Sequence, residues 1–507
     1  MHPLSESGFS YDFDSTAGHF PYRAGIHSEM YRVKPWTIRQ YAGFGTAKSA
    51  NERLKALIDA GATGLSIAFD LPTQMGFDPN HDMSIGEVGK VGVSISTLND
   101  MRELFEGIDI AHISTSMTIN ATAPIILLMY ELIALERGIN PADLRGTIQN
   151  DILKEYISRG TFIFSPEHSM NLVCETIKYC KENLPNWNPI SISGYHMAEA
   201  GATPVQEVAF TFANAISYLD MLTQNGEDIN FISERLTFFF AARITLLEEV
   251  AKFRAAREVW AKIMKSRYKA TSEKSLKLRF HTQTAGVQLI AQNPELNTVR
   301  VTVQAIAAIL GGSQSIHTNA FDEAISLPNE SSATFAIRTQ QILQLETDLA
   351  KAVDPFEGSH LMEKLTTDFV VEIEKEIEHI LDLGGAVHGI ERNYQKEQIE
   401  ANAYRIAKEI DDQERPIIGL NVHQQNSNGV LGTFTSRRED SIEPNISKID
   451  RMKTDEVRVR NQLDELAARA GGGLPIISEI RKALLCGASV GEICEALKRS
   501  WGSFTGS

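Results

Sequence analysis

The sequence predicts a parallel (β/α)8 barrel followed by a smaller C-terminal helical region, and three observations carry this prediction. Short apolar segments alternate with longer amphipathic ones over residues 46–365. The alternation repeats eight times, and a strand–helix unit repeated eight times is typical of a closed barrel. Beyond about residue 365 the chain becomes more charged and helical. We therefore expect an N-terminal segment at 1–45, a barrel at 46–365 and a linker and helical region at 366–507.

The predicted strands follow an irregular, aromatic-rich start. They are Gly64–Asp70, His112–Thr118, Arg145–Gln149, Ile190–His196, Arg235–Phe240, Leu278–Thr284, Gln314–Thr318 and Leu349–Asp354. Helical stretches separate them, and apolar residues recur there every three or four positions. Examples are Pro124–Glu136, Val205–Leu222 and Leu246–Lys265.

The C-terminal region has its own pattern. A charged helical stretch, Thr367–Leu383, precedes a strand-like segment, Pro416–Val422, and a polar segment, Gln424–Ile449. Two further helices are predicted near Arg451–Ala470 and Ile476–Leu497, and the three glycines at 471–473 indicate a turn between them.

Small polar residues occupy alternate positions on several predicted strands. The rows are His112, Ser114, Ser116 and Thr118; Ser191, Ser193 and Tyr195; and Ser313, Ser315 and His317. Alternate side chains share one face of a strand. The inner face of such a barrel is normally filled by Val, Ile and Leu, and hydroxyls there need a polar partner. We infer that the barrel encloses a long, polar small molecule.

Composition and motifs exclude several functions. A net charge of −16 argues against non-specific nucleic-acid binding. The four cysteines lack metal-ligand spacing, and no metal, P-loop or dinucleotide motif occurs. The N-terminus lacks a signal-peptide layout, and the longest apolar stretch, Ile125–Leu135, contains Glu131 and is too short for a membrane span. We expect a soluble, cytoplasmic enzyme.

Chemistry in parallel barrels is found at the carboxyl ends of the strands. Those ends carry Asp70, Thr118, Gln149, His196, Gln283, His317 and Asp354. Gln149, His196 and the nearby Arg159 together indicate a site that binds an oxyanion and a carboxylate. The alternative for Arg159 is a helix-surface ion pair with Glu155, four residues earlier.

Several long motifs, in order along the chain, resemble the methylmalonyl-CoA mutase family. They are Lys34–Phe44 (KPWTIRQYAGF), Ala68–Leu71 (AFDL), Ser116–Asn120 (SMTIN), Gly146–Glu155 (GTIQNDILKE), Ile192–His196 (ISGYH), Arg235–Phe239 (RLTFF), His281–Thr284 (HTQT) and Gln314–Asn319 (QSIHTN). The resemblance runs from about residue 20 to the end. It implies a barrel that opens around the pantetheine arm of coenzyme A, in agreement with the hydroxyl rows.

The resemblance also implies an activity, namely an adenosylcobalamin-dependent radical rearrangement in which a thioester carbon migrates. It assigns Tyr41 to the space between corrin, adenosyl group and substrate, and Arg159 to the substrate carboxylate. It assigns Gln149 and His196 to the acyl group, with His196 polarising the thioester oxygen. Gln283 and Glu323 match residues near the deoxyadenosyl group. The positions that it assigns to the substrate-binding wall are Met30, Lys34, Thr37, Arg39, Gln40, Ser116, Thr118, Thr147, Arg235, Thr237 and Ser315.

The acyl group is predicted from a few positions. Tyr41 with Arg159 resembles the type that interconverts (R)-methylmalonyl-CoA and succinyl-CoA. In the resemblance, isobutyryl-type mutases have Phe at position 41 and Gln at position 159. The 2-hydroxyisobutyryl type has Ile at position 41 and Asp in place of Ala68. Departures from the family pattern are His27–Met30 (HSEM), Lys34, Asn186 and Glu357–His360 (EGSH). They leave open a mutase for another branched acyl-CoA, or a non-catalytic paralogue that binds acyl-CoA.

The family's cobalamin loop, D-x-H-x-x-G, supplies the histidine that coordinates cobalt. It does not occur in these 507 residues, and the nearest look-alike, Asp78–His81, has the wrong spacing. The resemblance therefore implies that a separate small subunit binds cobalamin and that the two chains form a hetero-oligomer.

Overall fold

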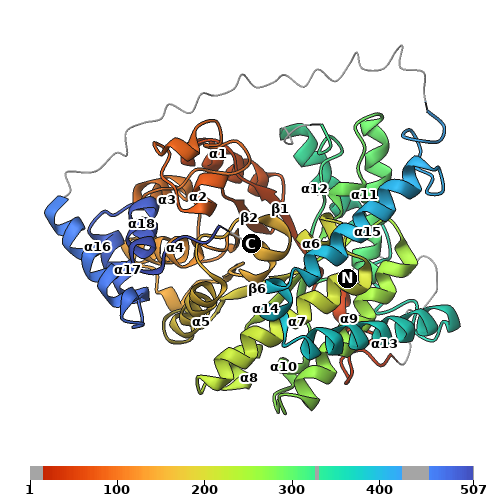
Figure 1. Cartoon of the computed structure of the whole chain (residues 1–507). Helices are drawn as coiled ribbons and strands as arrows, with labels where there is room; N and C mark the ends of the chain where they lie inside the picture. Colours follow the sequence, from red (N-terminus) through yellow and green to blue (C-terminus); the bar gives the residue numbers. More distant parts are fainter. Residues whose placement is uncertain (1–14, 326–329, 425–455, 506–507) are drawn as a thin grey trace.

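The computed structural model describes residues 15–325, 330–424 and 456–505, and it is built around a parallel sheet that curves into a barrel (Figure 1). The order of strands is β5-β4-β3-β2-β1-β9-β8-β7-β6, and every pairing is parallel. The strands are β1 Thr37–Ala42, β2 Gly64–Ala68, β3 Ser114–Thr118, β4 Gly146–Ile148, β5 Trp187–Asn188, β6 Ile190–Ser193, β7 Leu236–Ala242, β8 Phe280–Thr284 and β9 Ser315–His317.

β5 and β6 are two halves of a single strand position, separated by Pro189. Proline has no backbone N–H to donate, so the ladder is interrupted there. β5 pairs with β4 and β6 pairs with β7. The Ser191 N–H donates to the Gln149 carbonyl at 2.9 Å, which joins the two sides. The sheet therefore closes as a barrel with eight strand positions, and the predicted fold class is confirmed.

Seven of the eight predicted strands are present, and the eighth prediction was wrong. Residues 349–354 form turns, and Leu349 and Val353 pack on the core there. The eighth strand position is instead filled by β1, which was not predicted because it lies in the segment expected to be irregular. Its inward side chains include Thr37, Arg39 and Tyr41, so it lacks the apolar pattern of a barrel strand.

Smaller corrections concern strand ends and the C-terminal region. The β6 strand stops at Ser193, and Tyr195 and His196 begin a short helix instead. His112 lies before β3 and is exposed, so it does not join the polar row. Residues 416–422 form turns with one isolated bridge, Ile418 to Val422, rather than a strand. Most of the predicted polar segment 424–449 lies outside the described residues.

Helices surround the barrel, and the predicted helices near 124–136, 205–222 and 246–265 are confirmed as α4, α7 and α9. The helix bounds are α1 Ala47–Asp59, α2 Leu71–Met75, α3 Leu98–Leu104, α4 Ala123–Glu136, α5 Pro166–Asn183, α6 Tyr195–Glu199, α7 Pro204–Gln224, α8 Ile229–Ser233, α9 Leu246–Ser266, α10 Glu273–Leu276, α11 Asn297–Leu310, α12 Glu330–Leu345, α13 His360–Asp382, α14 Ala386–Glu391, α15 Tyr394–Asp411, α16 Glu456–Gly471, α17 Ile477–Leu485 and α18 Val490–Trp501.

The C-terminal helices pack on the outside of this ring at two separate places. α13 lies against α7 and α9, whereas α17 lies against α4 and α5 (Figure 1). The predicted glycine turn is present between α16 and α17, where Gly473 adopts the left-handed conformation. Within the described ranges, no helix is both long and apolar enough to cross a membrane.

Candidate active site

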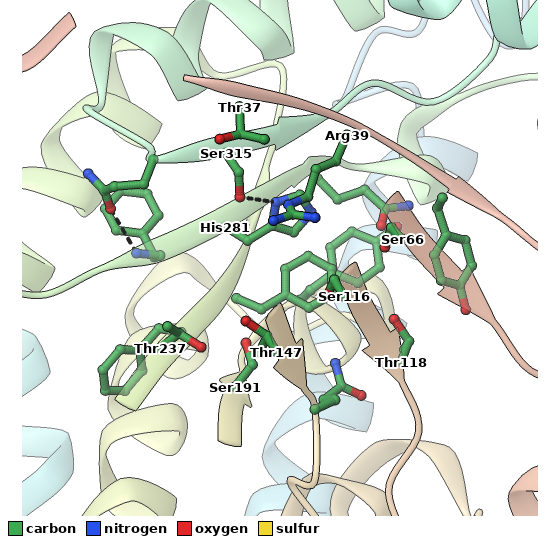
Figure 2. Close-up of a pocket in the computed structure, with 18 of the residues that line it drawn as sticks. Thr37, Arg39, Ser66, Ser116, Thr118, Thr147, Ser191, Thr237, His281 and Ser315 are labelled. Atoms are coloured by element: carbon green, nitrogen blue, oxygen red, sulfur yellow. Dashed lines mark hydrogen bonds between the residues drawn. The ribbon is translucent and has the colours of Figure 1, made fainter. Parts of the chain in front are cut away.

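A cavity of about 740 Å³ occupies the inside of the barrel. Figure 2 shows its wall, in which short hydroxyl side chains from neighbouring strands point toward a common centre. They belong to Thr37, Ser66, Ser116, Thr118, Thr147, Ser191, Thr237 and Ser315. These side chains are too short to meet at the barrel axis, so the interior stays open where Val, Ile and Leu would fill it. The inference of a polar, hollow barrel from the sequence agrees with this cavity.

The predicted site residues converge on this cavity with two exceptions. Those that line it are Met30, Lys34, Thr37, Arg39, Tyr41, Ser116, Thr118, Thr147, Gln149, Arg159, His196, Thr237, Gln283, Ser315 and Glu323. Gln40 is not among the lining residues; its side chain is buried and donates to the Thr318 carbonyl. Arg235 is also absent from the lining and precedes β7. Neighbouring residues on a strand point to opposite faces, which is why Gln40 diverges from Arg39 and Tyr41.

Tyr41 stands at the carboxyl end of β1, where the cavity opens. Its backbone N–H donates to His317 Nδ1 at 3.0 Å, and the two rings meet edge to face. Burial raises the pKa of the Tyr41 phenol, and Arg159 and a hydrogen bond with Thr118 oppose this shift. Burial also lowers the pKa of His317 to about 4, so the ring is neutral and can accept the Tyr41 N–H at neutral pH. The phenol is therefore a neutral group at the mouth.

Arg159 lies beside a buried polar network that includes Glu155 and Lys154. Arg159 ends a single π-helical turn, Glu155–Arg159, a rare form that often occurs at functional sites. Its Nη1 is 3.9 Å from Oε1 of Glu155, which is fully buried and also bonded to Lys154. No hydrogen bond joins the Arg159 guanidinium to another described residue. The ion-pair alternative thus holds only as a long contact, and the guanidinium still lines the cavity.

His196 approaches the same end of the cavity from α6. Its Nδ1 is 3.0 Å from the Ser193 hydroxyl, and its ring lies edge-on to Phe239. Burial lowers the pKa of His196 well below its usual value, and the positive charges of Lys154 and Arg159 lower it further. The imidazole is therefore neutral at neutral pH and can hydrogen-bond an oxygen without carrying a charge.

Two carboxyls line the cavity nearby, and only one of them, Glu323, was expected from the sequence. Glu199 is on α6, one helical turn after His196, and it lines the cavity with Glu323 and Gln283. Burial raises the pKa of both carboxyls to about 7. Oε1 of Glu199 is buried and has no hydrogen-bond partner among the described residues. The three-residue spacing from His196 is the signal that could have identified Glu199.

The opposite end of the cavity, before the strands begin, is bordered by positive charge. His27, Lys34 and Arg279 line it. The pKa of His27 is lowered by burial and by the charges of Lys277, Lys34 and Arg279, which shows that these cations surround it. Between the ends, burial lowers the pKa of Arg39 to about 10, and its guanidinium donates to the carbonyls of Leu65 and Ser114. This end can bind anionic groups such as phosphates.

The fold and the cavity define a barrel protein with a polar interior that is bordered by positive charge at one end. The family model for methylmalonyl-CoA mutase matches residues 5–503. The chain therefore belongs to the methylmalonyl-CoA mutase family, whose members are cobalamin-dependent acyl-CoA mutases, and it is an enzyme of the isomerase class.

The similar proteins are named either as 2-hydroxyisobutanoyl-CoA mutase or as methylmalonyl-CoA mutase. The chain is 42% identical over 493 residues to the 2-hydroxyisobutanoyl-CoA mutase large subunit of Aquincola tertiaricarbonis, covering 96% of this chain and 87% of that protein. It is 40% identical to the methylmalonyl-CoA mutase of Rhizobium meliloti, covering 97% and 69%. It is 39% identical to the methylmalonyl-CoA mutase large subunit of Propionibacterium freudenreichii, covering 97% and 68%.

Proposed function

We propose that this chain is the large, substrate-binding subunit of an adenosylcobalamin-dependent acyl-CoA mutase that interconverts (R)-methylmalonyl-CoA and succinyl-CoA. One observation carries the proposal: a single cavity has the cations Lys34 and Arg279 at one end and Tyr41, Gln149, Arg159 and His196 at the other. An acyl-CoA has the matching layout, because its phosphates and its acyl group are at opposite ends of a pantetheine arm.

Each part of the substrate has a chemically suited neighbour in this proposal. Lys34 and Arg279 bind the phosphates, and the hydroxyl wall receives the amides of the pantetheine arm. Gln149 and the neutral His196 hydrogen-bond the thioester oxygen, where charge develops as the acyl group migrates. Arg159 forms a two-donor pair with the substrate carboxylate, for which its guanidinium is free of other hydrogen bonds to described residues. Closure of the barrel around the arm would exclude water from this end.

The residues at the mouth fit an adenosyl group. Glu199 has an unpartnered buried oxygen there, and its raised pKa favours a protonated carboxyl near neutral pH, so it can both donate to and accept from ribose hydroxyls. Glu323 and Gln283 line the same part of the cavity. When bound, adenosylcobalamin supplies the radical chemistry that begins hydrogen transfer.

A separate small subunit is proposed to hold the corrin. The D-x-H-x-x-G loop does not occur in these residues, and two of the similar proteins are themselves named large subunits. In this proposal the mouth of the barrel would contact the cofactor, and the small subunit would supply the histidine that coordinates cobalt. Equilibrium dialysis with adenosylcobalamin tests this: the chain alone should bind weakly and show no turnover, and the small subunit should restore both. Micromolar or tighter binding by the chain alone, with turnover, would contradict the two-subunit proposal.

A second candidate is the rearrangement of 2-hydroxyisobutyryl-CoA. It is favoured by the 42% identity to the mutase subunit of that name, a chain of comparable length. Tyr41 and Ala68 argue against it, because the resemblance gives that type Ile and Asp at these positions. An isobutyryl-type mutase and a non-catalytic acyl-CoA-binding paralogue are further alternatives.

One assay separates these candidates. Methylmalonyl-, isobutyryl- and 2-hydroxyisobutyryl-CoA are each supplied with adenosylcobalamin and the small subunit, and the isomerised product is measured. We expect turnover of methylmalonyl-CoA far above the other two. A preference for either of the others would replace the proposed substrate, and binding of acyl-CoA without any turnover by the assembled complex would favour the paralogue.

A further inference from the structure

A buried polar network behind the cavity wall determines which way the amide of Gln149 faces. Its centre is Asn120, which follows β3 and is 4% exposed. Asn120 Nδ2 lies 3.0 Å from Gln149 Oε1 and also donates to Glu155 Oε1. Asn120 Oδ1 accepts the backbone N–H of Asp151 at 3.0 Å. Gln149 is in this way connected to residues that do not themselves line the cavity.

The two outer partners fix the orientation of the Asn120 amide. The Asp151 N–H can only donate, so it requires the oxygen of Asn120. The Glu155 carboxylate can only accept, so it requires the nitrogen. Glu155 is fully buried and paired with the ammonium of Lys154, and both charges therefore stay inside the protein together. Turning the amide over would break both contacts at once.

The orientation of the Asn120 amide determines the orientation of the Gln149 amide. Because Asn120 presents N–H to Gln149, the oxygen of Gln149 faces the network, and the planar amide turns its nitrogen toward the cavity. The backbone supports this geometry: Asn150, the next residue, has a φ of +48°, an uncommon value for a residue other than glycine. The reversal there brings the Asp151 N–H back to Asn120.

We propose that Asn120, held by Asp151 and Glu155, is a positioning residue that makes Gln149 a hydrogen-bond donor to the substrate's thioester oxygen. Gln149 otherwise has no preference, since an amide can offer either oxygen or nitrogen. An oxygen facing the thioester carbonyl would repel it, so the orientation decides whether Gln149 helps or hinders. This inference rests on the proposed function, because it requires an acyl-CoA in the cavity.

The test uses infrared spectroscopy of the full chain with ¹³C-carbonyl-labelled methylmalonyl-CoA, which needs no cobalamin. A hydrogen bond to the thioester oxygen lowers its carbonyl stretching frequency relative to the free ester. Gln149→Met defines the frequency without that donor. In Asn120→Leu the side chain keeps nearly the same shape but has no N–H, so nothing holds the oxygen of Gln149 toward the network. We expect Asn120→Leu and Asn120→Ala to raise the frequency toward the Gln149→Met value.

Asn51→Ala is the matched control. Asn51 is also buried and donates to two carbonyls, those of Leu104 and Glu106, but it is absent from the cavity lining. It should lose a comparable amount of thermal stability and leave the frequency unchanged. Asn120→Leu keeps the shape of the side chain, so it remains informative if Asn120→Ala does not fold.

The outcomes separate the inference from the proposed function. A wild-type frequency in both Asn120 variants, with a shift in Gln149→Met, would overturn the role of Asn120 and leave acyl-CoA binding intact. Failure of the wild-type chain to bind labelled substrate at all would instead contradict the proposed function. With cofactor and small subunit present, kcat should fall about 3- to 10-fold in Asn120→Ala. The same change in a Gln149→Met background should cost nothing further, whereas a merely structural role would multiply the two losses.

Discussion

At the N-terminal end of the barrel the cavity is bordered by the cations Lys34 and Arg279, whereas at the C-terminal end it is bordered by neutral groups and by carboxyls with a raised pKa. Lys34 is exposed and Arg279 is half-buried at the first end. At the second, His196 has a lowered pKa and Glu199 a raised one, both chiefly because of burial. Long-range attraction suits the recognition of phosphates, which remain partly in water. Directed hydrogen bonds in a dry site suit a reaction in which charge develops at one atom.

The difference also appears in how each end is supported. Asn120, Glu155 and Lys154 form a buried network behind the wall at the C-terminal end, so the orientation of the side chains there is fixed. Lys34 instead has an exposed side chain at the other end. We infer that the N-terminal end determines affinity for any CoA ester and the C-terminal end determines which acyl group reacts.

The largest effect on acyl-CoA binding should come from a substitution that blocks the cavity between its two ends. Ser116 lies on β3 with its hydroxyl in the cavity, as Figure 2 shows. Ser116→Trp places an indole across the path of the pantetheine arm, and we expect acyl-CoA binding to weaken by about 100-fold or more. Isothermal calorimetry with methylmalonyl-CoA measures this. Ser266→Trp on the exposed end of α9 is the control, and undiminished binding by Ser116→Trp would show that the ester does not pass through the barrel.

The next effect concerns only the C-terminal end. Arg159→Gln removes the charged donor proposed for the substrate carboxylate, and a charged hydrogen bond contributes roughly 1.5–3 kcal/mol. The corresponding loss in kcat/KM for methylmalonyl-CoA is about 10- to 150-fold. Isobutyryl-CoA, which has no carboxylate, should be affected much less. Equal losses for the two esters would mean that Arg159 does not recognise the carboxylate.

A smaller effect concerns stability and pH at the same end. The pKa of Glu199 is raised by burial from 4.5 to about 7, so the folded protein holds a proton that the unfolded chain releases. The associated stability is complete below about pH 4.5 and is lost as the pH rises through about 7. Glu199→Gln removes this dependence and should reduce the loss of stability between about pH 5 and pH 8 by on the order of 1–2 kcal/mol.

Urea unfolding midpoints at the two pH values measure that dependence. The exposed Glu182 provides the control, since Glu182→Gln should leave the dependence on pH as in the wild type. If Glu199→Gln also behaved as the wild type, Glu199 would be ionised in the folded protein, and the part of the mouth that it forms would be anionic at neutral pH.

The smallest effect belongs to the N-terminal end. Lys34→Ala should weaken binding of every CoA ester by about 2- to 5-fold, because exposed ion pairs contribute little and are screened by salt. The loss should shrink at high salt and disappear with acyl-pantetheine, which lacks the nucleotide phosphates. Competition binding with the two ligands measures this. A loss that depended on the acyl group would place Lys34 at the wrong end of the cavity.

The sequence predicted the barrel because seven of its strands kept an apolar, recurring pattern, as β2 and β7 illustrate. β1 was not predicted because Thr37, Arg39 and Tyr41 face a hollow interior, so its inward positions carry no apolar residues. The resemblance still assigned these residues to the site, and all three line the cavity. The segment 349–354 was mistaken for a strand because packing on the outer layer requires apolar residues just as a strand does.

The sequence by itself determined the eight-fold alternation, the hydroxyl rows and the residue types that meet at the cavity. Only the tertiary structure decided their roles relative to one another. Glu199 lines the cavity because of its position on α6, and the side chain of Gln40 points away from the cavity because alternate residues of β1 face opposite sides. The orientation of Gln149 depends on Asn120, Asp151 and Glu155, which come from separate turns of the chain. Burial and hydrogen-bond direction are properties of neighbours in space, and for these residues the neighbours are set by the closed barrel.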